Sequence, residues 1–175
     1  MANSASPSAA LPLAHAALRI IMVLNWVMGA CVLALLVVSP NERWIMSAFD
    51  LTPSPEAARL IMGLRAIAAL GLIAVLLNYA GLKRLLAIVG TVRAGDPFVA
   101  SNAQRLQAIA WLMLALQLLS MVIRAIADAV SIQGQPLDID AGFSINGWLA
   151  VLLTFLLARV FAEGTRMRDD LEGTV

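Results

Sequence analysis

The sequence predicts an all-α integral membrane protein, and two observations lead to that class. Of its 175 residues, 61% are hydrophobic and 13% are charged, whereas a soluble domain carries about 25% charged residues. Four uncharged apolar runs occupy residues 20–38, 66–82, 106–123 and 141–158, and each, with its flanks, reaches the about 20 residues that a membrane-crossing helix needs. Lipid cannot hydrogen-bond to the backbone, and the runs lack the alternation of barrel strands. We therefore expect four transmembrane helices.

The predicted spans cover residues 18–39, 58–82, 106–130 and 143–162. They leave no room for a separate soluble domain, so residues 16–175 are expected to form a single four-helix transmembrane domain, arranged as a compact bundle. Residues 1–15 are predicted to be a disordered N-terminal segment, because their first dozen residues are rich in Ser, Ala and Pro. The single cysteine, Cys31, lies inside the first run, which excludes an intramolecular disulfide.

The connection between the second and third spans carries its own helical pattern. Residues 81–94 have apolar positions at roughly a helical period with a basic edge, so they either continue the second helix into the cytoplasm or lie on the inner leaflet. Gly95 is expected to end that helix. Asp96 has the chemistry of an N-cap and Pro97 that of a first helical residue, so the next helix is predicted to begin at Pro97. Two helices longer than the bilayer predict an antiparallel hairpin that projects into the cytoplasm.

The distribution of basic residues predicts the orientation. The middle connection and the C-terminal tail hold most of the loop Lys and Arg, while the connection after the first span holds one and the connection after the third span holds none. Because cytoplasmic loops are enriched in Lys and Arg, both termini and the middle connection are expected in the cytoplasm of a bacterial inner membrane.

Three charged residues fall within the outer thirds of the spans: Arg65, Arg124 and Asp128. Arg124 and Asp128 are spaced i,i+4 and can pair, and Arg65 could share the carboxylate. Three interpretations stay open: a structural cluster that fixes helix packing, a site for a small anionic or peptide ligand that opens outward, or an ion path. Asn25, Asn78 and Gln117 are expected to make hydrogen bonds between helices.

The sequence carries no recognisable catalytic, cofactor-binding or metal-binding pattern. Its only histidine, His15, precedes the first span, and there is no Cys/His cluster, Gly-rich phosphate loop or Ser/His/Asp set. A helix-turn-helix is also missing, so no direct contact with nucleic acid is expected. The chain is predicted to be a non-enzyme without a cofactor.

Two short segments resemble a known family. Gly95-x-Pro97-Phe98 followed by Asn102, Arg105 and Leu106, together with the tail Phe161-x-Glu163-Gly164, is similar to the family filed as domain of unknown function 2975. Its members are small bacterial proteins with four spans, often encoded beside a small Cro-like helix-turn-helix regulator. The resemblance implies that this chain is the membrane partner of such a regulator.

The candidate partner-binding residues combine these segments with the cytoplasmic basic positions: Lys83, Arg84, Arg93, Phe98, Asn102, Arg105, Glu163, Arg166 and Arg168. The basic ones among them are also explained by topology and by contact with anionic lipid. We expect a non-enzymatic regulatory or signalling protein with membrane lipid and a cytoplasmic regulator as partners. The alternatives are a small-molecule transporter or channel subunit and a structural protein that forms homo-oligomers.

Overall fold

The computed structural model describes residues 7–40, 46–47, 53–131 and 139–172. Its long helices are α1 (Pro7–Val38), α3 (Pro55–Arg93), α4 (Ala100–Val130) and α5 (Ile145–Glu172). Each is long and apolar enough to cross a membrane, and the described residues contain no strand. The predicted all-α class with four membrane-spanning helices is confirmed.

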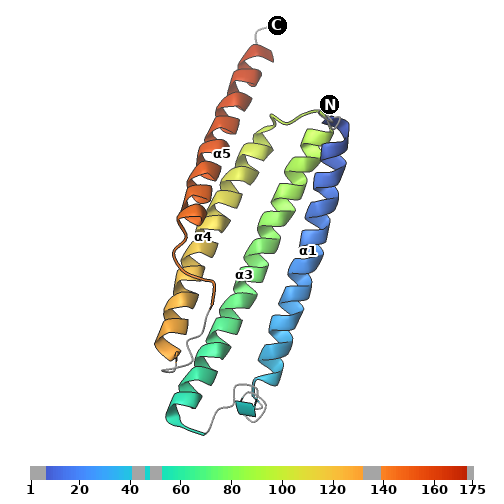
Figure 1. Cartoon of the computed structure of the whole chain (residues 1–175). Helices are drawn as coiled ribbons and strands as arrows, with labels where there is room; N and C mark the ends of the chain where they lie inside the picture. The colour runs from blue at the N-terminus through green and yellow to red at the C-terminus, as the bar shows by residue number, and fades with distance from the viewer. Residues whose placement is uncertain (1–6, 41–45, 48–52, 132–138, 173–175) are drawn as a thin grey trace, which may run out of the picture.

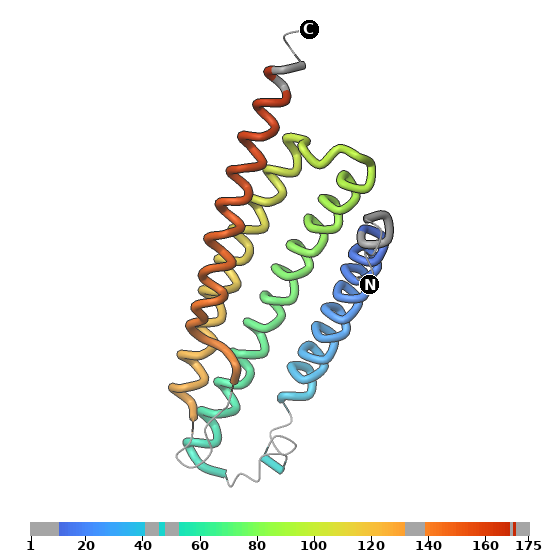
Figure 2. Tube along the Cα trace, turned by 45° about the horizontal axis from the view of Figure 1, so that its top comes forward, coloured from blue at the N-terminus to red at the C-terminus, as the bar shows by residue number. Residues whose placement is uncertain are grey.

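The four helices stand side by side in one row, in the order α1, α3, α4, α5 (Figures 1 and 2). Within the described residues α1 packs only on α3 and α5 packs only on α4, so the row does not close. The expectation of a compact bundle is therefore wrong. In lipid the hydrocarbon chains solvate an apolar helix face as well as another helix does, so there is no hydrophobic force to close the row.

Glycines bring neighbouring helices into close contact. A Cβ on Gly29 of α1 would lie 2.9 Å from Val75 Cγ1 of α3, and a Cβ on Gly63 of α3 would lie 2.6 Å from Val130 Cγ1 of α4. Such small residues are typical of membrane helix interfaces because they let the backbones approach. The first interface also carries the predicted bond of Asn25, whose Nδ2 donates to the Val75 carbonyl at 3.1 Å.

The turn between α3 and α4 differs in one respect from the prediction. Gly95 ends α3 with φ of 85°, and the Asp96 N–H donates to the Thr91 carbonyl at 3.1 Å, as in a Schellman motif. The α4 helix then begins at Ala100 rather than at Pro97, and its N-cap, Val99, contributes no side-chain hydrogen bond. Asp96 therefore lies before the N-cap position of α4, and its carboxylate pairs with Arg168 of α5.

The N-terminal segment is more ordered than predicted. The α1 helix begins at Pro7, so residues 7–15 are helical, whereas residues 1–6 lie outside the described part. Two physical features explain the helix: proline is well tolerated in a first helical turn, and alanine has the highest helix propensity. The α3 and α5 helices also extend beyond their predicted spans, to Arg93 and Glu172. They do so at the same end of the molecule as the start of α1 (Figure 1).

Candidate functional site

The two ends of the helices differ in chemistry. We call the end with the α3–α4 turn and the C-terminal half of α5 the turn end, and the end where α1 finishes and α3 begins the loop end (Figure 1). The loop end holds the predicted intramembrane charges, and the turn end holds the residues that carry the family resemblance.

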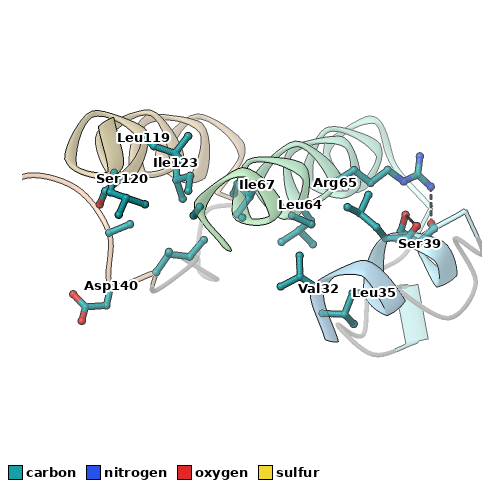
Figure 3. A pocket seen from close by; sticks show the side chains of 17 residues that line it. Val32, Leu35, Ser39, Leu64, Arg65, Ile67, Leu119, Ser120, Ile123 and Asp140 are labelled. Carbon is teal, nitrogen blue, oxygen red and sulfur yellow. Dashed lines mark hydrogen bonds between the residues drawn. The ribbon is translucent and has the colours of Figure 1, made fainter. Parts of the chain in front are cut away.

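A groove of about 830 Å³ opens at the loop end between α1, α3 and α4. Figure 3 shows Val32 and Leu35 of α1 on one side of it, Leu64 and Ile67 of α3 between the helices, and Ile123 of α4 beyond. The lining is almost wholly apolar, with four polar residues: Ser39, Arg65, Ser120 and Asp140.

The three predicted intramembrane charges do not form one cluster. Arg124 Nε lies 2.9 Å from Asp128 Oδ1, so the predicted i,i+4 pair is present. Arg65 instead directs its Nη2 to the Ser39 carbonyl at the end of α1, at 2.7 Å (Figure 3). Arg65 therefore does not share Asp128, because its position on α3 faces α1 rather than α4.

The α4 pair is exposed rather than enclosed. The side chains of Arg124 and Asp128 are 44% and 58% exposed, and Arg124 Nη1 also donates to the Ile139 carbonyl at 3.2 Å. Gly142 lies against the aliphatic part of the same arginine, where a Cβ would be 3.2 Å from Cγ. These contacts hold the chain segment before α5 against α4, which is a packing role.

The other predicted polar contacts have mixed outcomes. Gln117 Nε2 donates to the Gly142 carbonyl at 3.3 Å, so it joins α4 to the segment before α5 rather than to another helix. Asn78 is exposed on α3 and its side chain makes no hydrogen bond with the described residues. Within the described part of one chain, Asn78 therefore has no partner on another helix, because α1 and α4 pack on other faces of α3.

Asn102 is the buried residue whose hydrogen bonds hold the turn end together. It is fully buried, and its Nδ2 donates to Thr91 Oγ1 at 2.7 Å and to the Pro97 carbonyl at 2.9 Å. Its Oδ1 accepts from Arg105 Nη1 at 2.8 Å. One amide thus ties the end of α3, the turn and the start of α4 together. Asn102 and Arg105 were predicted to bind a partner; in the structure their side chains close the turn, with Asn102 fully buried and Arg105 half-buried.

The C-terminal half of α5 docks on this turn. The rings of Phe98 and Phe161 lie 5.4 Å apart between centroids, and a Cβ on Gly164 would lie 3.4 Å from the Phe98 ring. Arg168 forms an ion pair with Asp96. Beneath these contacts, Ile88 of α3, Leu106 of α4 and Ala158 of α5 form a buried cluster. The two segments that resemble the family therefore meet in space.

Several predicted partner residues remain accessible at the turn end. Lys83 and Arg93 are exposed on α3, and Arg84 donates to the Ala80 carbonyl of its own helix at 2.9 Å. Glu163 and Arg166 face each other at 3.8 Å with side chains 64% and 78% exposed.

Two features of the turn end were not predicted from the sequence. Asp96 was assigned to a helix cap, since its partner Arg168 lies 72 residues away. A polar groove between α4 and α5, lined in part by Gln104, Gln107 and Arg159, was also missed. The residue in the sequence that could have indicated this groove is Arg159, the first charged residue after the last apolar run.

A family model described as protein of unknown function DUF2975 matches residues 15–175. The chain belongs to this family. The match covers both ends of the row and all the residues of the resemblance. No curated protein and no solved structure matches the chain.

Proposed function

We propose that this protein is a non-enzymatic regulatory protein of the bacterial inner membrane that binds a small cytoplasmic helix-turn-helix transcription regulator at its turn end. The observation that carries the proposal is the assembly of the two family segments there: Phe98 packs against Gly164, and next to these motif residues Asp96 pairs with Arg168. The two contacts join residues that are 66 and 72 positions apart in the chain. A turn that only connected two spans would not need contacts with the end of α5.

The shape of the turn end supports a protein partner. The α5 helix runs past the α3–α4 turn (Figure 1), so it offers a free helical arm beside the turn. Exposed apolar and charged side chains lie together on these elements: Phe98 is 44% exposed, Met167 is 57% exposed, and Arg166 is exposed beside Glu163. The Lys and Arg distribution predicts that this end faces the cytoplasm.

The mechanism is sequestration by mass action. Free regulator falls as it binds the turn end, and binding at the membrane keeps it from its DNA. A signal at the loop end could change this only by binding two conformations of the protein with different affinity.

The experiment is co-purification of the neighbouring gene product with the full-length protein in detergent. We expect wild type to retain the regulator, and we expect Phe98→Ala and Arg166→Glu to lose most of it while still inserting into the membrane. Met62→Ala is the matched control, since Met62 is an exposed apolar residue at the loop end. The proposal fails if wild type retains no regulator, or if both turn-end variants retain as much as the control.

A second candidate function, a structural protein that forms homo-oligomers, is favoured by Asn78. Its amide is exposed on a spanning helix, and a polar group in hydrocarbon is stabilised by a partner on another helix. Cross-linking in native membranes tests it: wild type should give dimers that Asn78→Leu lacks.

A further inference from the structure

The groove between α4 and α5 at the turn end has a volume of about 690 Å³ and a mixed lining. Alanines of both helices form part of it, among them Ala103 and Ala158. The polar residues come from both helices too: Gln104 and Gln107 from α4, and Arg159, Glu163 and Arg166 from α5. None of the interactions that close the α3–α4 turn uses Gln104, Gln107 or Arg159.

The depth of this groove matches the headgroup layer. Arg159 directly follows the last apolar run of the sequence, which ends at Ala158. A span that starts near Phe143 needs about 20 residues to cross the hydrocarbon, so it ends near Glu163. Arg159 therefore lies in the last turn inside the hydrocarbon boundary, and its long side chain reaches the level of the lipid phosphates.

The charges of the groove favour an anion. Arg159 is exposed and its side chain makes no hydrogen bond or ion pair with the described residues. Arg166 is opposed by Glu163 at 3.8 Å, so the groove keeps one positive charge in excess. A guanidinium binds phosphate oxygens through paired N–H donors, and the amides of Gln104 and Gln107 offer further donors from the facing helix.

The deep end of the groove is apolar. Phe155 lines it one turn below Arg159, and the Trp111 ring packs edge-on against Phe155 with 5.2 Å between centroids. A ligand that fills the whole groove thus carries an anionic head at the level of Arg159 and an apolar part at the level of Phe155. An anionic phospholipid has this arrangement, whereas free phosphate has only the head.

We propose that the α4/α5 groove binds an anionic phospholipid, with the phosphate held by Arg159, Gln104 and Gln107 and an acyl chain against Phe155. The four residues that would hold the lipid are not part of the surface proposed for the regulator, although the groove shares Glu163 and Arg166 with that surface. The two proposals are therefore tested with different variants.

The test uses the full-length protein in phosphatidylcholine vesicles that contain a trace of spin-labelled phosphatidylglycerol or spin-labelled phosphatidylcholine. The measurement is the fraction of each label that the protein immobilises. We expect wild type to prefer phosphatidylglycerol by about fivefold or more, the preference that one well-placed cation gives at a membrane surface. Arg159→Gln should abolish the preference, and Gln107→Leu should reduce it without any change in charge.

Lys83→Gln is the matched control, since Lys83 is exposed at the same end of the row but lies outside the groove. It should keep the preference. Excess inorganic phosphate, added at constant ionic strength, should not release the labelled lipid. Equal losses in Arg159→Gln and Lys83→Gln would mean that net charge alone attracts the lipid, and this outcome would overturn the site. Release by inorganic phosphate would assign the groove to a soluble anion and would overturn it too.

Discussion

At the residue scale, two asparagines show that the same type of side chain can be buried and hydrogen-bonded at one position and exposed at another. Asn102 is fully buried and bonded on three sides, whereas Asn78 is exposed on the middle of α3. The sequence marks both as polar residues in or near an apolar run. Only the packing of neighbouring helices decides which one has partners.

Asn102→Ala should destabilise the protein. The change leaves the Pro97 carbonyl and Arg105 without their partner, and an unsatisfied buried polar group costs about 1–3 kcal/mol. Thermal unfolding in detergent measures it, with Asn78→Ala as the control of identical chemistry. Measured on the detergent-solubilised monomer, Asn78→Ala is expected within about 0.5 kcal/mol of wild type, because its amide makes no hydrogen bond with the described residues. Equal shifts in the two variants would contradict the structural role of Asn102.

Asp128→Asn should have a small effect. A buried pair that loses its anion would be destabilised by about 3–5 kcal/mol, but Arg124 and Asp128 are 44% and 58% exposed. Exposed pairs of this kind contribute about 0–1 kcal/mol. A shift in the unfolding free energy above about 2 kcal/mol would contradict this prediction and would show that the pair is shielded from water.

At the scale of the helices, the close approach of α3 and α4 depends on Gly63. A Cβ there would lie 2.6 Å from both Cγ atoms of Val130, which is much closer than van der Waals contact, so either the Val130 side chain or one of the two helices must shift.

Gly63→Ala should destabilise the protein by about 1–3 kcal/mol, the usual cost of overpacking. Adding Val130→Ala should recover part of the loss, because the two positions are in contact. Gly90→Ala is the control on the same helix: nothing lies within 4 Å of its Cβ position, so the alanine should stabilise α3 by about 0.5–1 kcal/mol. A Gly63→Ala variant as stable as Gly90→Ala would contradict this interface.

The sequence predicted the helices well and their arrangement poorly, for a physical reason. An apolar run of about 20 residues that crosses lipid must be a helix, so the positions of the spans can be predicted from the sequence. The same lipid accepts any apolar face, so the pattern does not say which faces pack, and the open row was not foreseen. At the candidate site, the i,i+4 spacing revealed Arg124 and Asp128. The pair of Asp96 and Arg168 has no such local signal.

At the scale of the whole molecule, the orientation in the membrane decides what the turn end can meet. In a variant with Cys31→Ser, single cysteines placed by Ser101→Cys and Ser131→Cys lie at opposite ends of α4. An impermeant maleimide added to intact cells should label only the second, because the basic residues flank the turn. Labelling of the first would place the turn end outside and would remove the basis for a cytoplasmic partner.

The row also has a consequence for how the protein is made. In the part of the chain that the structure describes, every helix contacts only its neighbours in chain order. Each interface can therefore form as soon as the next helix leaves the ribosome, without waiting for a more distant helix. Assembly is then nearest-neighbour, as in repeat proteins, with low contact order. A chain that lacks residues 1–50 should still insert and keep the α3–α4–α5 packing. Its thermal transition should remain cooperative and should still respond to Gly63→Ala, and loss of that response would mean that α1 supports interfaces that it does not touch.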